Sequence, residues 1–144
     1  MRVPLVVALL LPLAAHATSS LTLAGASGAG QLALDGEGSS TSHIVKVASL
    51  TMDTDGPGFT LSISSGSLSK ADGGTPIPFQ VALVDEGAAP PPAAAFTVPS
   101  GSRYPFSTMT PGAVHKDLYI MYQSASLQDP GAYAARIDCD ISDN

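Results

Sequence analysis

Hydrophobic residues recur at every second position in several parts of this chain. From Phe59 to Ser64 apolar side chains alternate with Thr and Ser, and Phe79, Val81 and Leu83 repeat the pattern. Successive side chains of a strand point to opposite faces, so each segment predicts a strand with one buried face. The segment Thr75 to Pro78 precedes the second of them. Its prolines cannot donate to a ladder, which indicates a strand start or a sheet edge.

The final third of the chain is the most regular. Its segment Leu118 to Tyr122 carries apolar or aromatic residues on both faces, which predicts a central strand. A turn signal, Gln128 to Gly131, follows. Alternation then continues unbroken from Tyr133 to Ile141 and predicts one long strand. The residues expected to face inward are Tyr133, Ala135, Ile137, Cys139 and Ile141.

Other apolar segments are shorter or less regular. The stretch Ile44 to Met52 changes phase part-way, and a β-bulge near Ala48 reconciles its two halves. Further short strands are expected at Ser20 to Ala24, Gln31 to Leu34 and Ala94 to Val98. The connections expected between strands are Gly25 to Gly30, Asp35 to Ser42, Gly87 to Pro92 and Pro99 to Pro111. Together these segments predict an all-β protein, a single β-sandwich of seven or eight strands.

The N-terminus has the three parts of a secretory signal peptide. Arg2 supplies the positive charge, an apolar core of about a dozen residues follows, and Ala15 and Ala17 form a small-x-small cleavage site. That core is shorter than the roughly 20 residues that a membrane-spanning helix needs. We therefore expect residues 1–17 to be removed and residues 18–144 to form the sandwich domain. The mature chain is expected to have no membrane span and to be periplasmic, extracellular or at the cell surface.

Charge and cysteine content narrow the functional classes. The net charge is −6 and only 12% of residues are charged, so the basic surface that binds nucleic acid is missing. Cys139 is the only cysteine, which excludes an intrachain disulfide. Its place in the alternation predicts an inward-facing core residue. A low-charge surface of this kind is common in exported proteins that pack into assemblies.

No motif predicts catalysis or a cofactor. His43 and His115 each lie beside a predicted strand start, and no serine stands in a Gly-x-Ser-x-Gly elbow. Asp53 and Asp55, followed by Gly56, have the spacing that begins a calcium loop, but the later ligands of such a loop are missing. A β-turn explains the same residues, and a weak calcium site is the alternative.

Two further motifs favour structural explanations. Asp138 and Asp140 are expected on one strand face with Arg136, as a solvated face that protects a sheet edge. The glycine-rich segment Gly25 to Gly30 lacks the Lys-Ser/Thr ending of a phosphate-binding loop, which favours a flexible connector. Neither motif therefore predicts an active site.

The C-terminal hairpin resembles a known class of proteins. The stretch Lys116 to Tyr122, then Asp129 to Tyr133 and the closing strand, is similar to small secreted bacterial proteins of the spore coat protein U and fimbrial-subunit type. As in pilus subunits, a glycine, Gly131, stands fourteen residues from the C-terminus and precedes alternating apolar residues. Two features of the pilus-subunit pattern differ here. Asp143 stands where that pattern has a penultimate aromatic residue, and the disulfide usual in pilus subunits is missing. The resemblance implies an immunoglobulin-like or pilin-like Greek-key sandwich.

The leading functional hypothesis is a non-catalytic, exported structural or adhesive surface protein. The resemblance implies a pilin-like subunit whose partners are copies of itself or other surface-assembly subunits. A neighbour's N-terminal segment would then add to the sandwich as a strand, and the donated apolar residues would be Leu21 and Leu23, or Leu32 and Leu34. The same segment forming the domain's own first strand is the alternative. The alternative function is a periplasmic or extracellular binding module for carbohydrate or calcium.

Overall fold

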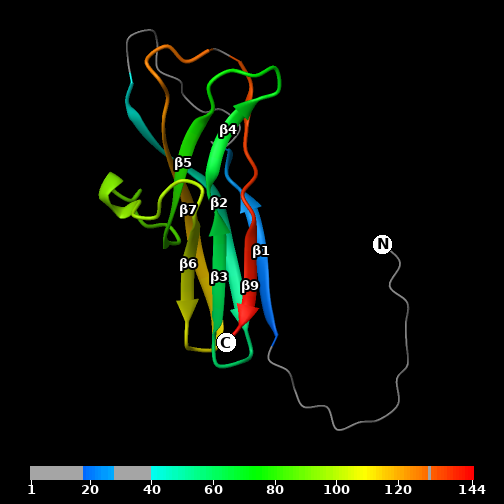
Figure 1. Cartoon of the computed structure of the whole chain (residues 1–144). Coiled ribbons are helices and arrows are strands. Elements are labelled where there is room, and N and C mark those ends of the chain that lie inside the picture. The colour runs from blue at the N-terminus through cyan, green and yellow to red at the C-terminus, as the bar shows by residue number, and fades with distance from the viewer. Residues whose placement is uncertain (1–17, 28–39, 130) are drawn as a thin grey trace, which may run out of the picture.

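A computed structural model describes residues 18–27, 40–129 and 131–144 of the chain. Within these residues the protein is all-β, as predicted, with nine strands and one short 3-10 helix, η2 (Ala93–Ala95). Figure 1 shows their arrangement. The strands are β1 (Ser19–Gly25), β2 (Ser42–Thr54), β3 (Phe59–Ser64), β4 (Gly66–Lys70), β5 (Ile77–Asp85), β6 (Arg103–Thr108), β7 (Gly112–Gln123), β8 (Tyr133–Ala134) and β9 (Cys139–Asp143).

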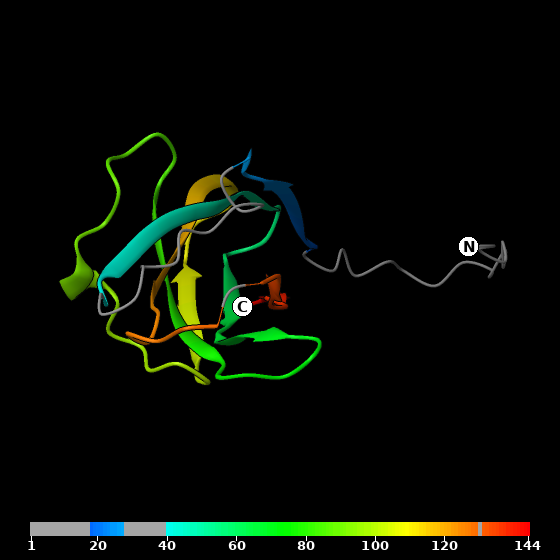
Figure 2. The ribbon, with the colours of Figure 1, turned by 90° about the horizontal axis from the view of Figure 1, so that it is seen from above.

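The strands form two antiparallel sheets. The larger sheet has the order β1-β2-β7-β5-β4-β8, and the smaller one has the order β6-β3-β9. Viewed from above, the larger sheet curls around the smaller one (Figure 2). The strand β7 lies between β2 and β5, which confirms the prediction of a central strand. No helix in the described part of the chain has the length and apolarity to cross a bilayer.

The hydrophobic core lies between the two sheets. Phe59, Leu61 and Ile63 of β3 are fully buried and face the larger sheet. The larger sheet contributes the inward side chains of β5 and β7, among them Phe79 and Tyr122. The period-2 pattern assigned the three β3 residues and Phe79 to a buried face, because a strand with one solvated face must bury every second side chain. For β7 it predicted apolar residues on both faces, and Tyr119 on the outer face is indeed buried as well.

The irregular strand β2 contains the expected bulge. Val45 is opposite Ile120 and Lys46 is opposite Tyr119, but Ala48 is already opposite Leu118. One residue of β2 is therefore extra at this point, as in a β-bulge. The shift brings both apolar halves of the strand onto the core side.

The prediction of a strand over Ala94 to Val98 is wrong. The chain there forms η2 and then passes over the outer face of the larger sheet. Phe96 is buried against Ala82 and Tyr119 on that face. The side-chain amide of Gln80 donates to the carbonyl oxygens of Phe96 and Val98 at 2.9 and 2.8 Å. The apolar residues of this segment thus cover a sheet and do not join one.

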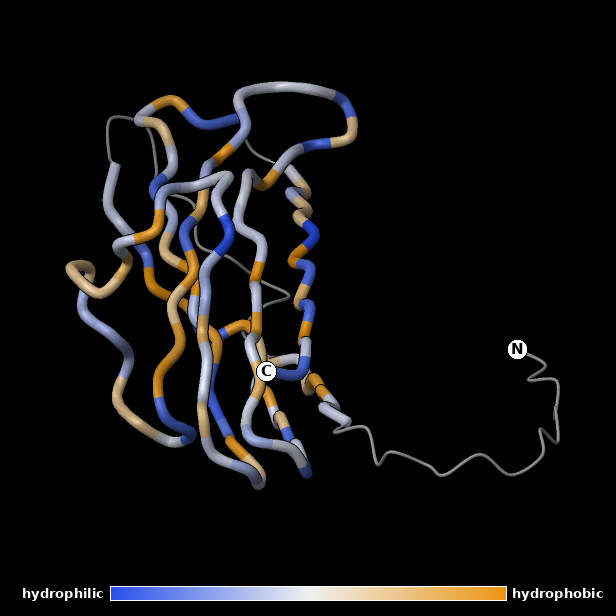
Figure 3. Tube along the Cα trace, turned by 60° about the horizontal axis from the view of Figure 1, so that its bottom comes forward, coloured by the Kyte–Doolittle hydropathy of each residue, from blue (hydrophilic) through white to orange (hydrophobic). Residues whose placement is uncertain are grey.

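The prediction of a single long strand over Tyr133 to Ile141 is also wrong. The segment divides into β8, which pairs with β4, and β9, which pairs with β3. Hydropathy alternates towards the C-terminus (Figure 3), and Ile137, Cys139 and Ile141 all pack against the core. Of the five residues predicted to face inward, Tyr133 also packs against the core, but Ala135 is exposed. The chain crosses from one sheet to the other between residues 134 and 139.

Two strands were not predicted. β4 has only one buried apolar residue, Leu68, and β6 lies in a segment expected to be a connection. β6 is an edge strand that contains Pro105, which is where a sheet tolerates proline. The predicted signal peptide with Ala15 and Ala17, and the predicted strand Gln31 to Leu34, lie outside the described residues.

Candidate functional site

The strand β1 forms one edge of the larger sheet and is the candidate site. All seven of its residues pair with β2, in the register Leu21 opposite Met52 and Leu23 opposite Leu50. Its other side faces β9, an edge strand of the smaller sheet (Figure 1). We call the space between these two strands the β1–β9 seam.

A side-chain hydrogen bond crosses the seam at one end. The hydroxyl of Ser19 donates a hydrogen bond to the carboxylate of Asp143. This bond joins side chains only, and within the described residues β1 and β9 are not paired as strands. Among the described residues, the main-chain groups on the outer side of β1 therefore have no strand partner, as is usual at the edge of a sheet.

The apolar residues of β1 are incompletely covered. Leu21 packs against the core, whereas Leu23, two residues further along the same face, is 52% exposed. Its partner on β2, Leu50, is only 1% exposed. Across the seam, Cys139 and Ile141 of β9 are half-buried. Leu21 and Leu23 thus lie in the domain's own first strand, with an uncovered apolar surface beside Leu23.

The other edge strands carry features that hinder pairing. β6 contains Arg103 and Pro105, β8 has only two residues, and β9 carries Asp140 and Asp143. Charges, prolines and short length are the usual protection of a sheet edge. β1 has the sequence Ser-Ser-Leu-Thr-Leu-Ala-Gly, with neither a charge nor a proline. Among the described strands it is the unprotected edge.

Cys139 faces inward, as expected, but is only half-buried. Burial raises the pKa of its thiol, and the carboxylates of Asp140 and Asp138 raise it further. The thiol therefore stays protonated near neutral pH, where a catalytic or metal-binding cysteine would need to be a thiolate.

The calcium candidates Asp53 and Asp55 lie at the end of β2 and in the turn that leads to β3. One oxygen of Asp55 accepts a hydrogen bond from the backbone nitrogen of Thr18 at 2.7 Å. The backbone nitrogen of Gly56 donates to the hydroxyl of Thr54 at 3.1 Å, which stabilises the turn. In the residues with described positions, no group of three or more His, Cys, Asp or Glu side chains is arranged to hold a metal ion.

The remaining charged candidates are held in separate pairs. Arg136 contacts Asp138 at 2.5 Å, and Arg103 of β6 pairs with Asp140. The two carboxylates thus have different partners, and the pairing of Asp140 with β6 was not visible in the sequence. All four side chains are substantially exposed, where ion pairs stabilise a protein little.

The two histidines lie far apart along one pair of strands. The ring of His43 stacks on Tyr122 with ring centroids 5.3 Å apart. His115 lies next to Thr51, 3.2 Å from its hydroxyl. His43 is opposite Tyr122 and His115 is opposite Thr51 in the β2–β7 register, so the fold does not bring the two rings together.

One buried carboxylate, Asp117 of β7, was not predicted from the sequence. It is 1% exposed and accepts hydrogen bonds from Lys46 at 2.8 Å, from the Ser49 hydroxyl at 2.8 Å and from the Gly87 backbone nitrogen at 3.0 Å. Burial alone would raise the pKa of Asp117, but these bonds outweigh it and lower the pKa. The hydrogen bond to Asp117 raises the pKa of Lys46. Asp117 fastens the loop after β5 to the sheet.

The chain matches no protein-family model, no curated protein and no solved structure. Its function must therefore be inferred from the arrangement of its own residues.

Proposed function

We propose that this chain is a non-catalytic, exported structural or adhesive surface protein that assembles with further copies by strand addition at the β1–β9 seam. The observation that carries the proposal is the β1 edge, which is unprotected and leaves Leu23 half-exposed. The signal-peptide pattern and the low content of charged residues support export and close packing with other copies.

We further propose that the two sheets form a pilin-like or immunoglobulin-like sandwich. Chain-adjacent strands β2 and β3 lie in different sheets, and so do β6 and β7. Such crossings between sheets are typical of Greek-key sandwiches. In sandwiches of this kind, an incompletely covered edge is a natural place for a strand from a neighbour.

The segment that would be donated can be chosen by asking which of the two leucine pairs already lies in a strand of its own chain. Leu21 and Leu23 pair with β2 of their own chain, so we assign donation to the segment with Leu32 and Leu34, which lies outside the described residues. Its alternation places two leucines on one face of an extended strand. Covering the exposed half of Leu23 would contribute about 1 kcal/mol to the association, in addition to main-chain hydrogen bonds.

The test uses two variants of the chain comprising residues 18–144. Leu23→Asp removes the acceptor surface, and a double variant, Leu32→Asp with Leu34→Asp, removes the donor. Sedimentation velocity should show concentration-dependent oligomers for the unaltered chain and monomers for each variant alone. Mixing the two variants should restore a dimer but nothing larger, because only one donor–acceptor pair remains functional.

A matched control is Leu127→Asp, since Leu127 is also exposed, at 74%, but lies outside the seam. It should assemble like the unaltered chain. Thermal melts must show that the variants remain folded. The proposal is wrong if the unaltered chain is monomeric throughout, or if all variants assemble equally well.

A further inference from the structure

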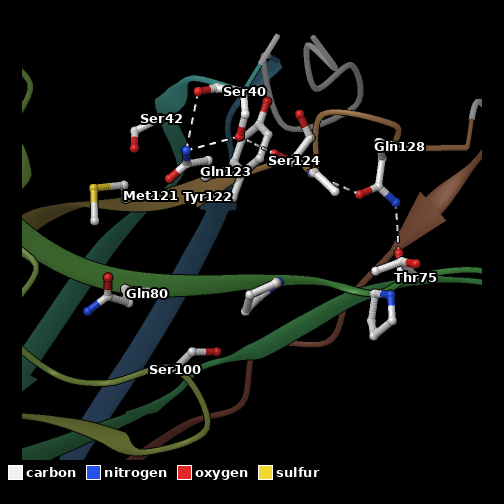
Figure 4. Close-up of a pocket in the computed structure, with 13 residues that line it drawn as sticks. Ser40, Ser42, Thr75, Gln80, Ser100, Met121, Tyr122, Gln123, Ser124 and Gln128 are labelled. Carbon is white, nitrogen blue, oxygen red and sulfur yellow. Dashed lines mark hydrogen bonds between the residues drawn. The ribbon is translucent and has the colours of Figure 1, made fainter. Parts of the chain in front are cut away.

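A pocket of about 500 Å³ lies at the end of the larger sheet where β7 finishes and where β2 and β5 begin. This volume is within the roughly 300–1,000 Å³ of small-molecule sites. The pocket lies far from the β1–β9 seam, because Ser42 and Gln123 form the opposite end of the β2–β7 pair from Thr54 and Gly112. Figure 4 shows its lining residues.

The described lining of the pocket carries no charged side chain and combines polar with apolar surface. Among the described residues, the polar side chains around the pocket are hydroxyls and amides, without a carboxylate, lysine, arginine or histidine. Pro76, Pro78 and Met121 are among the residues that supply the apolar surface, which is the larger part of the lining. An anionic ligand would lack a cation here, and a metal ion would lack carboxylate ligands. The lining therefore suits a neutral ligand with many hydrogen-bonding groups.

Two glutamine amides are held in fixed orientations. Gln80 donates both amide hydrogens to the carbonyls of Phe96 and Val98. The amide nitrogen of Gln123 donates to the backbone oxygen and the hydroxyl of Ser40, at 3.2 and 3.0 Å. Each amide nitrogen is thus engaged, and each amide oxygen, Oε1, is left as an acceptor.

These two oxygens accept no hydrogen bond from the described residues. No buried side-chain nitrogen or oxygen in the described part lacks a partner, so Oε1 of the half-buried Gln80 is accessible to solvent. Two accessible acceptors whose positions are fixed by other contacts need little ordering when a ligand binds. They would receive hydrogen bonds from a ligand's hydroxyl groups.

The hydroxyls around the pocket complement these acceptors. Ser42 and Thr75 have hydroxyls with no partner among the described residues, and each can donate and accept. Ser100 donates to the Gly66 carbonyl at 2.7 Å and keeps its acceptor capacity. Acceptors, dual-role hydroxyls and apolar surfaces together match the alternating hydroxyl groups and C–H faces of a sugar.

We propose that this pocket binds a neutral saccharide, with Gln80 and Gln123 as acceptors and the hydroxyls of Ser42 and Thr75 as the donors. The site is independent of the proposed assembly. It would give an exported surface protein a means of contacting glycans.

The test is a titration of the ¹⁵N-labelled chain of residues 18–144, followed by NMR, with maltotriose, cellotriose and N,N′,N″-triacetylchitotriose as probes. At least one probe should shift the signals of residues 121–124 and the side-chain amides of Gln80 and Gln123, with a dissociation constant of roughly 1 mM or below. The double variant Ser42→Ala with Gln123→Ala should weaken binding about three- to tenfold for each hydrogen bond lost.

Ser20→Ala, a serine-to-alanine change on β1 outside the pocket, is the matched control and should bind as the unaltered chain does. The Leu23→Asp variant should also bind, which separates this site from the assembly. The proposal is overturned if none of the three sugars shifts the pocket signals at about 50 mM. It is equally overturned if the double variant binds unchanged, or if only a neutral peptide, acetyl-Gly-Ser-Thr-Gly-amide, shifts these signals.

Discussion

The buried carboxylate of Asp117 provides the sharpest test of how the loop after β5 is held. We consider Asp117→Asn, which preserves the shape of the side chain and removes its charge. In the protein, one carboxylate oxygen accepts from Lys46 and Ser49, and the other accepts from the backbone nitrogen of Gly87. An asparagine has one acceptor oxygen, so in either orientation its NH₂ group faces a donor.

The cost follows from these contacts. In the better orientation the asparagine keeps its oxygen toward Lys46 and Ser49 and turns its NH₂ toward the Gly87 N–H. One charge-assisted hydrogen bond is then lost, about 1.5–3 kcal/mol, and a buried donor is left unsatisfied, about 1–3 kcal/mol. We expect a loss of about 3 kcal/mol in the free energy of unfolding. For a domain of this size, that lowers the melting temperature by roughly 10 °C.

Urea unfolding followed by circular dichroism measures this loss. Hydrogen exchange should also show faster exchange of the Gly87 amide in the variant. The control is Asp85→Asn, because Asp85 pairs with Lys116 but is 83% exposed and should cost less than about 1 kcal/mol. Equal effects of the two substitutions would refute the anchoring role of Asp117.

The same carboxylate predicts a pH dependence. Folding lowers the pKa of Asp117, so the unfolded chain binds the proton at a higher pH than the folded protein does. The stabilisation is therefore present above the unfolded pKa of about 4 and is lost as pH falls through the folded value. The stability difference between the unaltered chain and Asp117→Asn should be constant near neutral pH and shrink below about pH 4. A gap that persists unchanged at about pH 2 would contradict this assignment.

Three further substitutions or reactions test the packing. Gly58→Ala should lower the free energy of unfolding by more than about 2 kcal/mol, because the backbone has φ +148° and a Cβ there would lie 2.0 Å from the Thr108 carbonyl oxygen. A melting temperature within about 2 °C of that of the unaltered chain would count against this prediction. Leu61→Ala should cost about 2–5 kcal/mol in urea unfolding, since Leu61 is fully buried, whereas the exposed Leu127→Ala should change stability by about 0.5 kcal/mol or less. Iodoacetamide should alkylate Cys139 more slowly in the folded than in the urea-unfolded chain at about pH 8, because folding raises the pKa of its thiol. Equal alkylation rates in the two states would contradict this prediction and show an accessible thiolate in the folded protein.

Much of the fold was predictable because the information is local. β3 and β7 each carry their own alternation, and the phase change in β2 marks its bulge. β4 and β6 were missed since their few apolar residues are dispersed among Ser, Gly and Pro. The break between β8 and β9 was missed for a different reason: alternation specifies which side of a strand faces inward, but it does not specify which neighbour the strand pairs with.

The candidate sites depend on contacts between distant residues. β1 could be predicted as a strand, but its position at the edge of the larger sheet depends on which strands pair with β2. Gln80 and Gln123 lie far apart in the sequence, and only the pairing of β5 with β7 brings them to one pocket. Asp117 likewise looks like a surface residue until the loop at Gly87 covers it.

The two ends of the described chain meet at one pole of the molecule. Thr18 bonds to Asp55, and Asn144 bonds to Gly58 and Thr60, whereas the pocket opens beside Ser42 and Gln123 of the same long strand pair. The thirteen residues of β2 separate these poles by about 40 Å. A tether or fusion attached at either end would therefore leave the pocket facing away from its support. A displayed fusion or an immobilised sensor should accordingly be coupled through the termini, and a circular permutant could join them with a short linker.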